Sequence, residues 1–109
     1  ICSVPGLSGI YVGPADLAIS MGVDVTKATT DPAVRDAIVG IRRVASGAGL
    51  VPGIHAGDGK VGHVMAQLGF QMITLASESQ ALRRGAGAGL KEATAQDVPT
   101  EGSAAGGYQ

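Results

Sequence analysis

The stretch that decides the fold is Gly9-Ile10-Tyr11-Val12-Gly13-Pro14-Ala15-Asp16-Leu17. Its first residues are mostly apolar and predict a buried strand, which Gly-Pro then ends. The carboxylate of Asp16 therefore follows the C-terminal end of a strand, although Asp16 is also a candidate N-cap for a helical turn. In parallel α/β folds, ligands and metals bind at this end of the strands. The stretch thus predicts an α/β fold and marks Asp16 as a candidate site residue.

The composition fits one small domain and argues against several classes of partner. The chain has 109 residues, of which 45% are hydrophobic, and its formal net charge is −1. Nucleic acids and anionic membrane surfaces both require a cationic patch on the protein, and the sequence has no basic run. No apolar stretch approaches the roughly 20 residues that span a bilayer. The lone Cys2 allows no internal disulfide and the chain starts without a signal-peptide pattern, so a cytoplasmic location is expected.

Strand and helix patterns alternate along the chain after this stretch. Asp31 and Pro32 form a helix start, and apolar residues at helical spacing continue this helix to Gly47. Pro52 is awkward in a central strand, because proline cannot donate to the ladder. The other predicted elements are a helical turn over residues 16–21, strands over 50–54 and 70–75, a helix over 60–68 that Asp58 can cap, and a last helix from Glu78 to Ala88 or beyond.

Three such βα units imply three parallel strands with long apolar edges. An open sheet of this size cannot close a barrel, and its edges favour association with other strands. We therefore expect residues 1–93 to form part of a larger α/β structure. Residues 94–109 are polar and small, with Pro99 and many glycines, and are expected to be a disordered tail.

The motif around Asp16 resembles the HpcH/HpaI aldolase family, which are metal-dependent pyruvate aldolases on a TIM barrel. The likeness rests on the Gly-Pro-Ala-Asp-Leu motif and extends from about residue 3 to 90. It includes Asp31-Pro32-Ala33-Val34, Pro52-Gly53-Ile54 and Leu68-Gly69-Phe70. The resemblance implies that this chain corresponds to the last three βα units of a (β/α)₈ barrel, which is therefore incomplete in this chain.

The resemblance also implies a reaction and a set of site residues. Family members cleave 2-oxo-4-hydroxy acids reversibly to pyruvate, or a related 2-oxo acid, and an aldehyde. A divalent cation (Mg²⁺, Mn²⁺ or Co²⁺) is held by a Glu and an Asp, and Asp16 matches the Asp. Backbone groups at Gly13, Pro14 and Ala15 would bind the pyruvate carboxylate. The family's Glu, catalytic His and Arg are expected upstream, so no catalytic residue is expected in these 109 residues, and the chain alone is expected to be inactive.

His55 follows the second strand at the same end of the sheet as Asp16. The family usually has an aliphatic residue there, lining the substrate pocket, so His55 is either a substrate-binding residue or an ordinary strand-end histidine. His63 falls within a predicted helix and indicates a structural role. A metal site of His55, Asp58 and His63 is disfavoured, because the spacing matches no known ligand pattern.

Three interpretations remain open from the sequence. The first is a fragment of a metal-dependent aldolase that forms a homo-oligomer or associates with the missing half of the barrel. The second is a fragment of a citrate-lyase-type CoA-thioester lyase, although that branch usually has an acidic residue where this chain has Ala15. The third is a half-barrel that acts as a non-catalytic subunit or interaction module.

Overall fold

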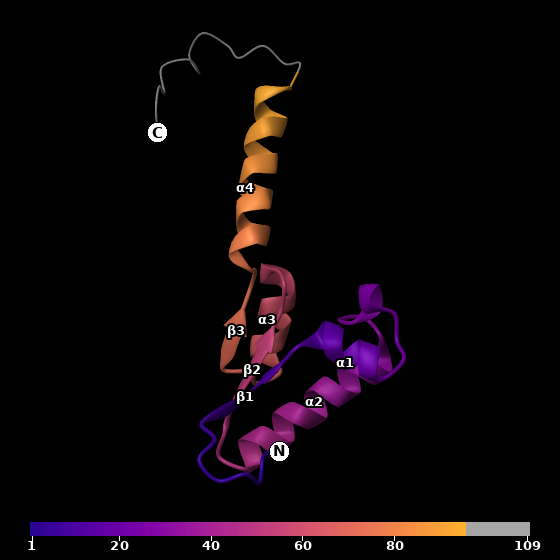
Figure 1. Cartoon of the computed structure of the whole chain (residues 1–109), viewed down its shortest axis with the longest axis vertical. Helices are drawn as coiled ribbons and strands as arrows, with labels where there is room; N and C mark the ends of the chain where they lie inside the picture. The colour runs from indigo at the N-terminus through magenta and orange to yellow at the C-terminus, as the bar shows by residue number, and fades with distance from the viewer. Residues whose placement is uncertain (96–109) are drawn as a thin grey trace. The chain divides into compact units, whose positions relative to one another are not determined.

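The chain forms two compact units in the computed structural model, which describes residues 1–95 (Figure 1). The first unit, Ile1–Ser77, contains the strands found within residues 1–95, and the second begins at Glu78. The described part of the second unit is helix α4, Glu78–Ala93, which starts where the sequence predicts and continues through its glycines. Of the predicted tail, residues 96–109 lie outside the described part of the chain. No helix within residues 1–95 combines the length and the apolar character needed to cross a membrane.

The first unit is a three-stranded parallel sheet with the strand order β1-β2-β3. Strand β2 lies at the centre, and β1 and β3 are the edges. The predicted parallel α/β class is therefore confirmed. The elements are β1 (Gly9–Val12), α1 (Pro14–Ser20), a short 3₁₀ helix η1 (Val25–Lys27), α2 (Pro32–Gly47), β2 (Val51–His55), α3 (Gly59–Gln67) and β3 (Met72–Thr74).

Two aspartates cap the helices of this unit as the sequence predicts. The Asp31 carboxylate accepts hydrogen bonds from the backbone N–H groups of Ala33 and Val34 at 2.9 and 3.2 Å. Asp58 caps α3 by accepting from the N–H of Val61 at 2.8 Å. Each side chain satisfies N–H groups that the first turn of a helix leaves without a backbone partner.

Helix α1 begins at Pro14, two residues before the predicted turn. Gly13 is its N-cap, and no side chain forms a capping hydrogen bond there. Pro14 is suited to the first helical position because its φ is fixed and it lacks an N–H to satisfy. The interpretation of Asp16 as an N-cap is therefore wrong, because Asp16 lies inside the first turn.

The helix η1 was not predicted from the sequence. The side chain of Asp24 accepts hydrogen bonds from the backbone N–H and the hydroxyl of Thr26, at 2.9 and 2.8 Å. These bonds stabilise the charged carboxylate, with the backbone bond contributing most, and they hold the pKa of Asp24 below its ordinary value.

Pro52 lies in the central strand, where a proline was expected to be awkward. Its carbonyl accepts a hydrogen bond from the N–H of Gln71 at 2.9 Å. Gln71 precedes β3, which begins at Met72 and pairs with β2 from Gly53 onward. The position of Pro52 thus lies at the start of the β2–β3 ladder, where no residue of β3 needs its missing N–H.

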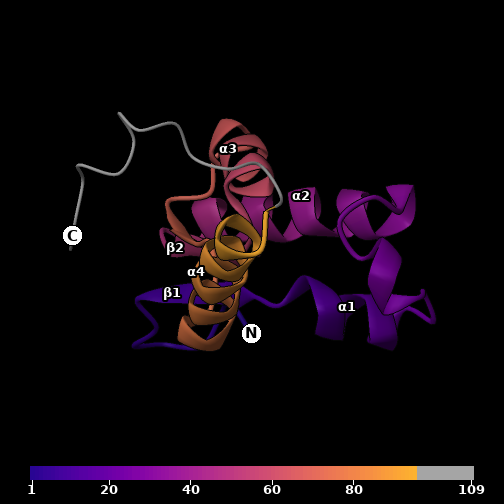
Figure 2. The same cartoon turned by 90° about the horizontal axis from the view of Figure 1, so that it is seen from above.

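The core lies between one face of the sheet and helices α2 and α3, which Figure 2 shows on the same side of the strands. Because side chains alternate along a strand, each strand places every second residue on this covered face. Val12 and Ile54 belong to the core together with Val34 and Ile38 of α2 and Met65 of α3. We call the opposite side the open face. It is formed by Gly9, Tyr11, Val51, Gly53, His55, Met72 and Thr74.

Candidate active site

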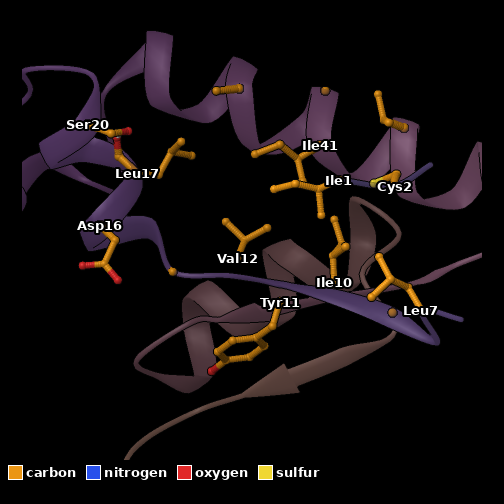
Figure 3. Close-up of a pocket in the computed structure, with 15 residues that line it drawn as sticks. Ile1, Cys2, Leu7, Ile10, Tyr11, Val12, Asp16, Leu17, Ser20 and Ile41 are labelled. Carbon is orange, nitrogen blue, oxygen red and sulfur yellow. The ribbon is translucent and has the colours of Figure 1, made fainter. Parts of the chain in front are cut away.

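Asp16 lies just beyond the C-terminal end of β1, as predicted. Its side chain is exposed, and Figure 3 shows the carboxylate turned away from the apolar side chains of Val12 and Leu17. A Cβ atom on Gly13 would come within 3.3 Å of Asp16 Oδ2. Glycine at position 13 therefore leaves room for the carboxylate to lie close to the backbone that precedes the helix.

The backbone at the start of α1 presents donors beside this carboxylate. The first helical hydrogen bond runs from the N–H of Leu17 to the carbonyl of Gly13 at 3.0 Å. The N–H groups of Ala15 and Asp16 come before it, and such first-turn groups have no partner within their helix. Pro14 has no N–H and is buried beneath the turn. The three predicted backbone positions, Gly13, Pro14 and Ala15, thus precede or open the turn that carries Asp16.

His55 is the last residue of β2, the strand next to β1, and is half-buried on the open face. Its Nδ1 atom lies 2.8 Å from Thr74 Oγ1 on β3. The Thr74 hydroxyl also lies 2.5 Å from the hydroxyl of Tyr11 on β1. Three strands therefore each contribute one side chain to a hydrogen-bonded group at the C-terminal end of the open face.

Tyr11 and Thr74 are residues of this group that the sequence did not indicate. They are 63 positions apart in the chain, so no local pattern joins them. One signal was present, because Thr74 is a hydroxyl-bearing residue inside a mostly apolar predicted strand.

The predicted metal site can be tested against the side chains that surround Asp16. Within residues 1–95, no group of three or more His, Cys, Asp or Glu side chains is placed to hold a metal ion. The combination of His55, Asp58 and His63 is not formed either, since Asp58 caps α3 and His63 is exposed on that helix. The described residues supply one suitable carboxylate, which by itself does not fit the donor set that a divalent cation requires.

An apolar groove of about 950 Å³ lies on the covered side of β1, between that strand and helices α1 and α2, and Gly13 and Asp16 line one end of it (Figure 3). Ile10 and Val12 project into it from the strand, and Leu17 and Ile41 line it from the helices. Tyr11 projects from the other side of β1. Apart from Asp16 and Ser20, the side chains that line the groove are mostly apolar, so most of its length is suited to packing against apolar side chains.

The chain was compared with known proteins in sequence and in structure. No protein-family model matches the chain. The chain is 36% identical over 78 residues to a hydroxypyruvate/pyruvate aldolase from Rhizorhabdus wittichii, an alignment that covers 72% of this chain and 31% of the relative. It also matches the crystal structure of an HpcH/HpaI aldolase/citrate lyase family protein from Burkholderia cenocepacia. That match has a TM-score of 0.78 and 31% identity, and covers 87% of this chain and 36% of that chain.

The predicted resemblance to the HpcH/HpaI aldolases is confirmed. It extends over most of this chain in sequence and in fold. The chain spans about a third of the length of each of these two proteins.

Proposed function

We propose that this chain is the C-terminal portion of a divalent-metal-dependent aldolase. The reaction is reversible cleavage of a 2-oxo-4-hydroxy acid to pyruvate, or a related 2-oxo acid, and an aldehyde. The observation that carries this proposal is the position of Asp16 and His55, which lie at the C-terminal ends of adjacent parallel strands in a chain that resembles HpcH/HpaI aldolases. Active sites of parallel α/β barrels lie at this end of the strands.

The chain's own residues have limited roles in this proposal. Asp16 contributes one carboxylate ligand to the metal, and its remaining ligands come from outside the described residues. The N–H groups of Ala15 and Asp16, held at the start of α1 by Gly13 and Pro14, donate hydrogen bonds to the carboxylate of the 2-oxo acid. Groups that polarise the carbonyl or move the proton are also supplied by other parts of the enzyme, so the isolated chain is inactive.

The open face of the sheet supports the idea that more strands belong to this structure. Tyr11, Val51 and Met72 expose 51%, 43% and 50% of their surface on it. Both edge strands have unpaired backbone groups, which favour pairing with further strands. We therefore propose that the remaining units of a barrel, from the same polypeptide or from an associated chain, cover this face, and that the assembled enzyme is a homo-oligomer.

An aldol-cleavage assay on the complete gene product that carries this chain tests the proposal. Pyruvate released from a 4-hydroxy-2-oxo acid is measured with lactate dehydrogenase and NADH, in the presence of Mg²⁺, Mn²⁺ or Co²⁺. We expect turnover by the complete gene product and none by the isolated 109 residues. No cleavage by the complete product with any of the metals would contradict the proposal, and substantial turnover by the isolated chain would refute its fragment status.

Asp16→Asn isolates the role of the carboxylate, because the amide keeps the size of the side chain but removes its charge. We expect kcat/KM to fall more than about 100-fold, the order of effect seen when a metal site is disrupted. Asp36→Asn is the matched control, because Asp36 is an exposed carboxylate on α2. An equal loss in both variants would remove Asp16 from the site.

The citrate-lyase-type alternative makes a different prediction for the same preparation. A CoA-thioester lyase would release CoA thiol from an acyl-CoA substrate, and that release can be followed with a thiol reagent. We expect none, because the position before Asp16 is Ala15, which has no second carboxylate. A half-barrel without catalytic function would show neither activity and would instead co-purify with a partner that supplies the missing strands.

A further inference from the structure

The strongest unassigned feature of the molecule is the hydrogen-bonded group of Tyr11, Thr74 and His55, which we call the Tyr11–Thr74–His55 network. Each residue comes from a different strand, and the Thr74 hydroxyl lies between the other two side chains at 2.5 and 2.8 Å. The backbone N–H of Ala56 donates to the carbonyl of Thr74 at 2.8 Å, which fixes the register of β2 and β3 at this point. The position of the network is therefore set by the sheet.

A glycine in the central strand, Gly53, leaves space for the Tyr11 side chain to reach Thr74. In the strand register, Tyr11 is opposite Gly53, and Gly53 is opposite Met72. A Cβ atom on Gly53 would lie 3.3 Å from Tyr11 Cδ2. The absence of a side chain at Gly53 allows the phenol ring to lie across the central strand and bring its hydroxyl to the far edge of the sheet.

The chemistry of the groups favours one direction for the hydrogen bonds. A phenol is a better donor than an aliphatic hydroxyl, and a neutral imidazole nitrogen is a better acceptor. We therefore assign the chain as Tyr11 O–H to Thr74 Oγ1, and Thr74 O–H to His55 Nδ1. When Nδ1 accepts, the proton of the neutral imidazole resides on Nε2, which becomes a donor. The contact with Thr74 thus involves Nδ1 and leaves Nε2 as the donor of the ring.

We propose that the network is a specificity element that recognises a hydroxyl oxygen on the substrate. The Nε2–H of His55 donates to that oxygen, and Tyr11 and Thr74 are positioning residues that hold the imidazole in the required tautomer and orientation. This inference rests on the proposed aldolase function. The substrate hydroxyl can belong to the aldehyde or to the 2-oxo acid, since either component can carry one beside its reacting carbonyl.

Paired substrates distinguish these two sources. In one arm, glycolaldehyde is compared with acetaldehyde while pyruvate is the partner. In the other, hydroxypyruvate is compared with pyruvate while acetaldehyde is the partner. Loss of one hydrogen bond to the substrate corresponds to about tenfold in kcat/KM. We therefore expect His55→Leu to lower the ratio of kcat/KM for the hydroxylated over the plain substrate by about tenfold in one of the two arms.

Two further variants separate recognition from a general effect on folding. His55→Gln retains an N–H donor and is expected to recover part of the ratio that His55→Leu loses. His63→Leu places the same substitution on an exposed histidine of α3 and is expected to leave both ratios unchanged. Ratios that stay the same in His55→Leu, or that change equally in His63→Leu, would overturn the proposal.

The tautomer of His55 gives a readout that does not depend on activity, and long-range ¹H–¹⁵N correlation spectra report which ring nitrogen carries the proton. We expect the Nε2–H form in the complete gene product, a mixture of forms in Thr74→Val, and a smaller change in Tyr11→Phe. A wild-type Nδ1–H form would refute the assignment even if the aldolase activity is present. A protein with the expected tautomer but no aldol activity would instead refute the proposed function.

Discussion

Ile54 and His55 are neighbours in the chain, yet the sheet uses them in different ways. Ile54 is completely buried beneath the helices, whereas His55 is half-buried on the open face and hydrogen-bonded to Thr74. The same alternation separates Val12, at 7% exposure, from Tyr11, at 51%. One face of each strand therefore forms the hydrophobic core, while the other carries the polar network. The contrast predicts that substitutions on the two faces affect different properties of the protein.

The largest effect on stability is expected on the covered face. Ile54→Ala removes a fully buried side chain from the core and should lower the free energy of unfolding by about 2–5 kcal/mol, through lost burial and a residual cavity. Met72→Ala is the control on the open face, where half of the side chain is exposed, and we expect a loss below about 1 kcal/mol. Urea unfolding of the 109-residue chain, without the units proposed to cover the open face, measures both. Equal losses would mean that the open face of this chain is buried to the same extent as the covered face.

The next largest effect on stability is expected at Gly9, where the backbones of β1 and β2 lie close together. A Cβ atom on Gly9 would lie 2.6 Å from the carbonyl oxygen of Val51, closer than real contacts allow. Gly9→Ala must therefore displace the strands, and we expect a loss of about 1–3 kcal/mol in urea unfolding. A Cβ atom on Gly47 of α2 would meet nothing within 4 Å, so Gly47→Ala is expected to gain up to about 1 kcal/mol. An unchanged free energy of unfolding in Gly9→Ala would show that β1 and β2 move apart at little cost.

A smaller loss is expected at the N-terminus of α2, the helix that covers β1 and β2. Asp31→Ala removes the acceptor for two backbone N–H groups, and loss of such a cap costs about 1 kcal/mol. The thermal unfolding temperature of the variant, compared with that of Asp36→Ala on the exposed surface of the same helix, measures the effect. Identical shifts would indicate that the Asp31 hydrogen bonds add nothing to the stability of the covered face.

The smallest effect on stability is expected on the open face. Tyr11→Phe removes only the hydroxyl that bonds Thr74, and an exposed hydrogen bond of this kind contributes about 0.5–1 kcal/mol at most. The variant should therefore unfold close to the wild type in urea while the ring signals of His55 shift in NMR spectra. A large loss of stability without a change at His55 would make Tyr11 a structural residue instead.

Local chemistry explains why much of the covered face could be predicted from the sequence. The helix starts at Asp31 and Asp58 depend on a capping side chain within three residues of the N–H groups that it satisfies. The position of Asp16 after β1 likewise follows from Gly-Pro, although the start of α1 at Pro14 shows that proline opens this helix rather than preceding it.

The rest depends on partners that are distant in the chain. The apolar run over residues 70–75 predicts a longer strand than Met72–Thr74. Phe70 instead donates its N–H to the carbonyl of Met65 and closes the end of α3, and β2 ends its pairing at His55. The Tyr11–Thr74 hydrogen bond depends on the register of three strands, which no local pattern of residues determines.

Titration with Mn²⁺ tests most directly whether Asp16 marks a metal-binding end of the sheet. The ion broadens NMR signals of nuclei close to it, so the amide signals of the ¹⁵N-labelled complete gene product report its position. We predict that signals from Gly13, Ala15 and Asp16 disappear first, that those of Gly9 and Val51 at the opposite strand ends persist, and that Asp16→Asn abolishes the effect. Broadening that is centred elsewhere, or that is unchanged in Asp16→Asn, would contradict the assignment of Asp16 as a metal ligand.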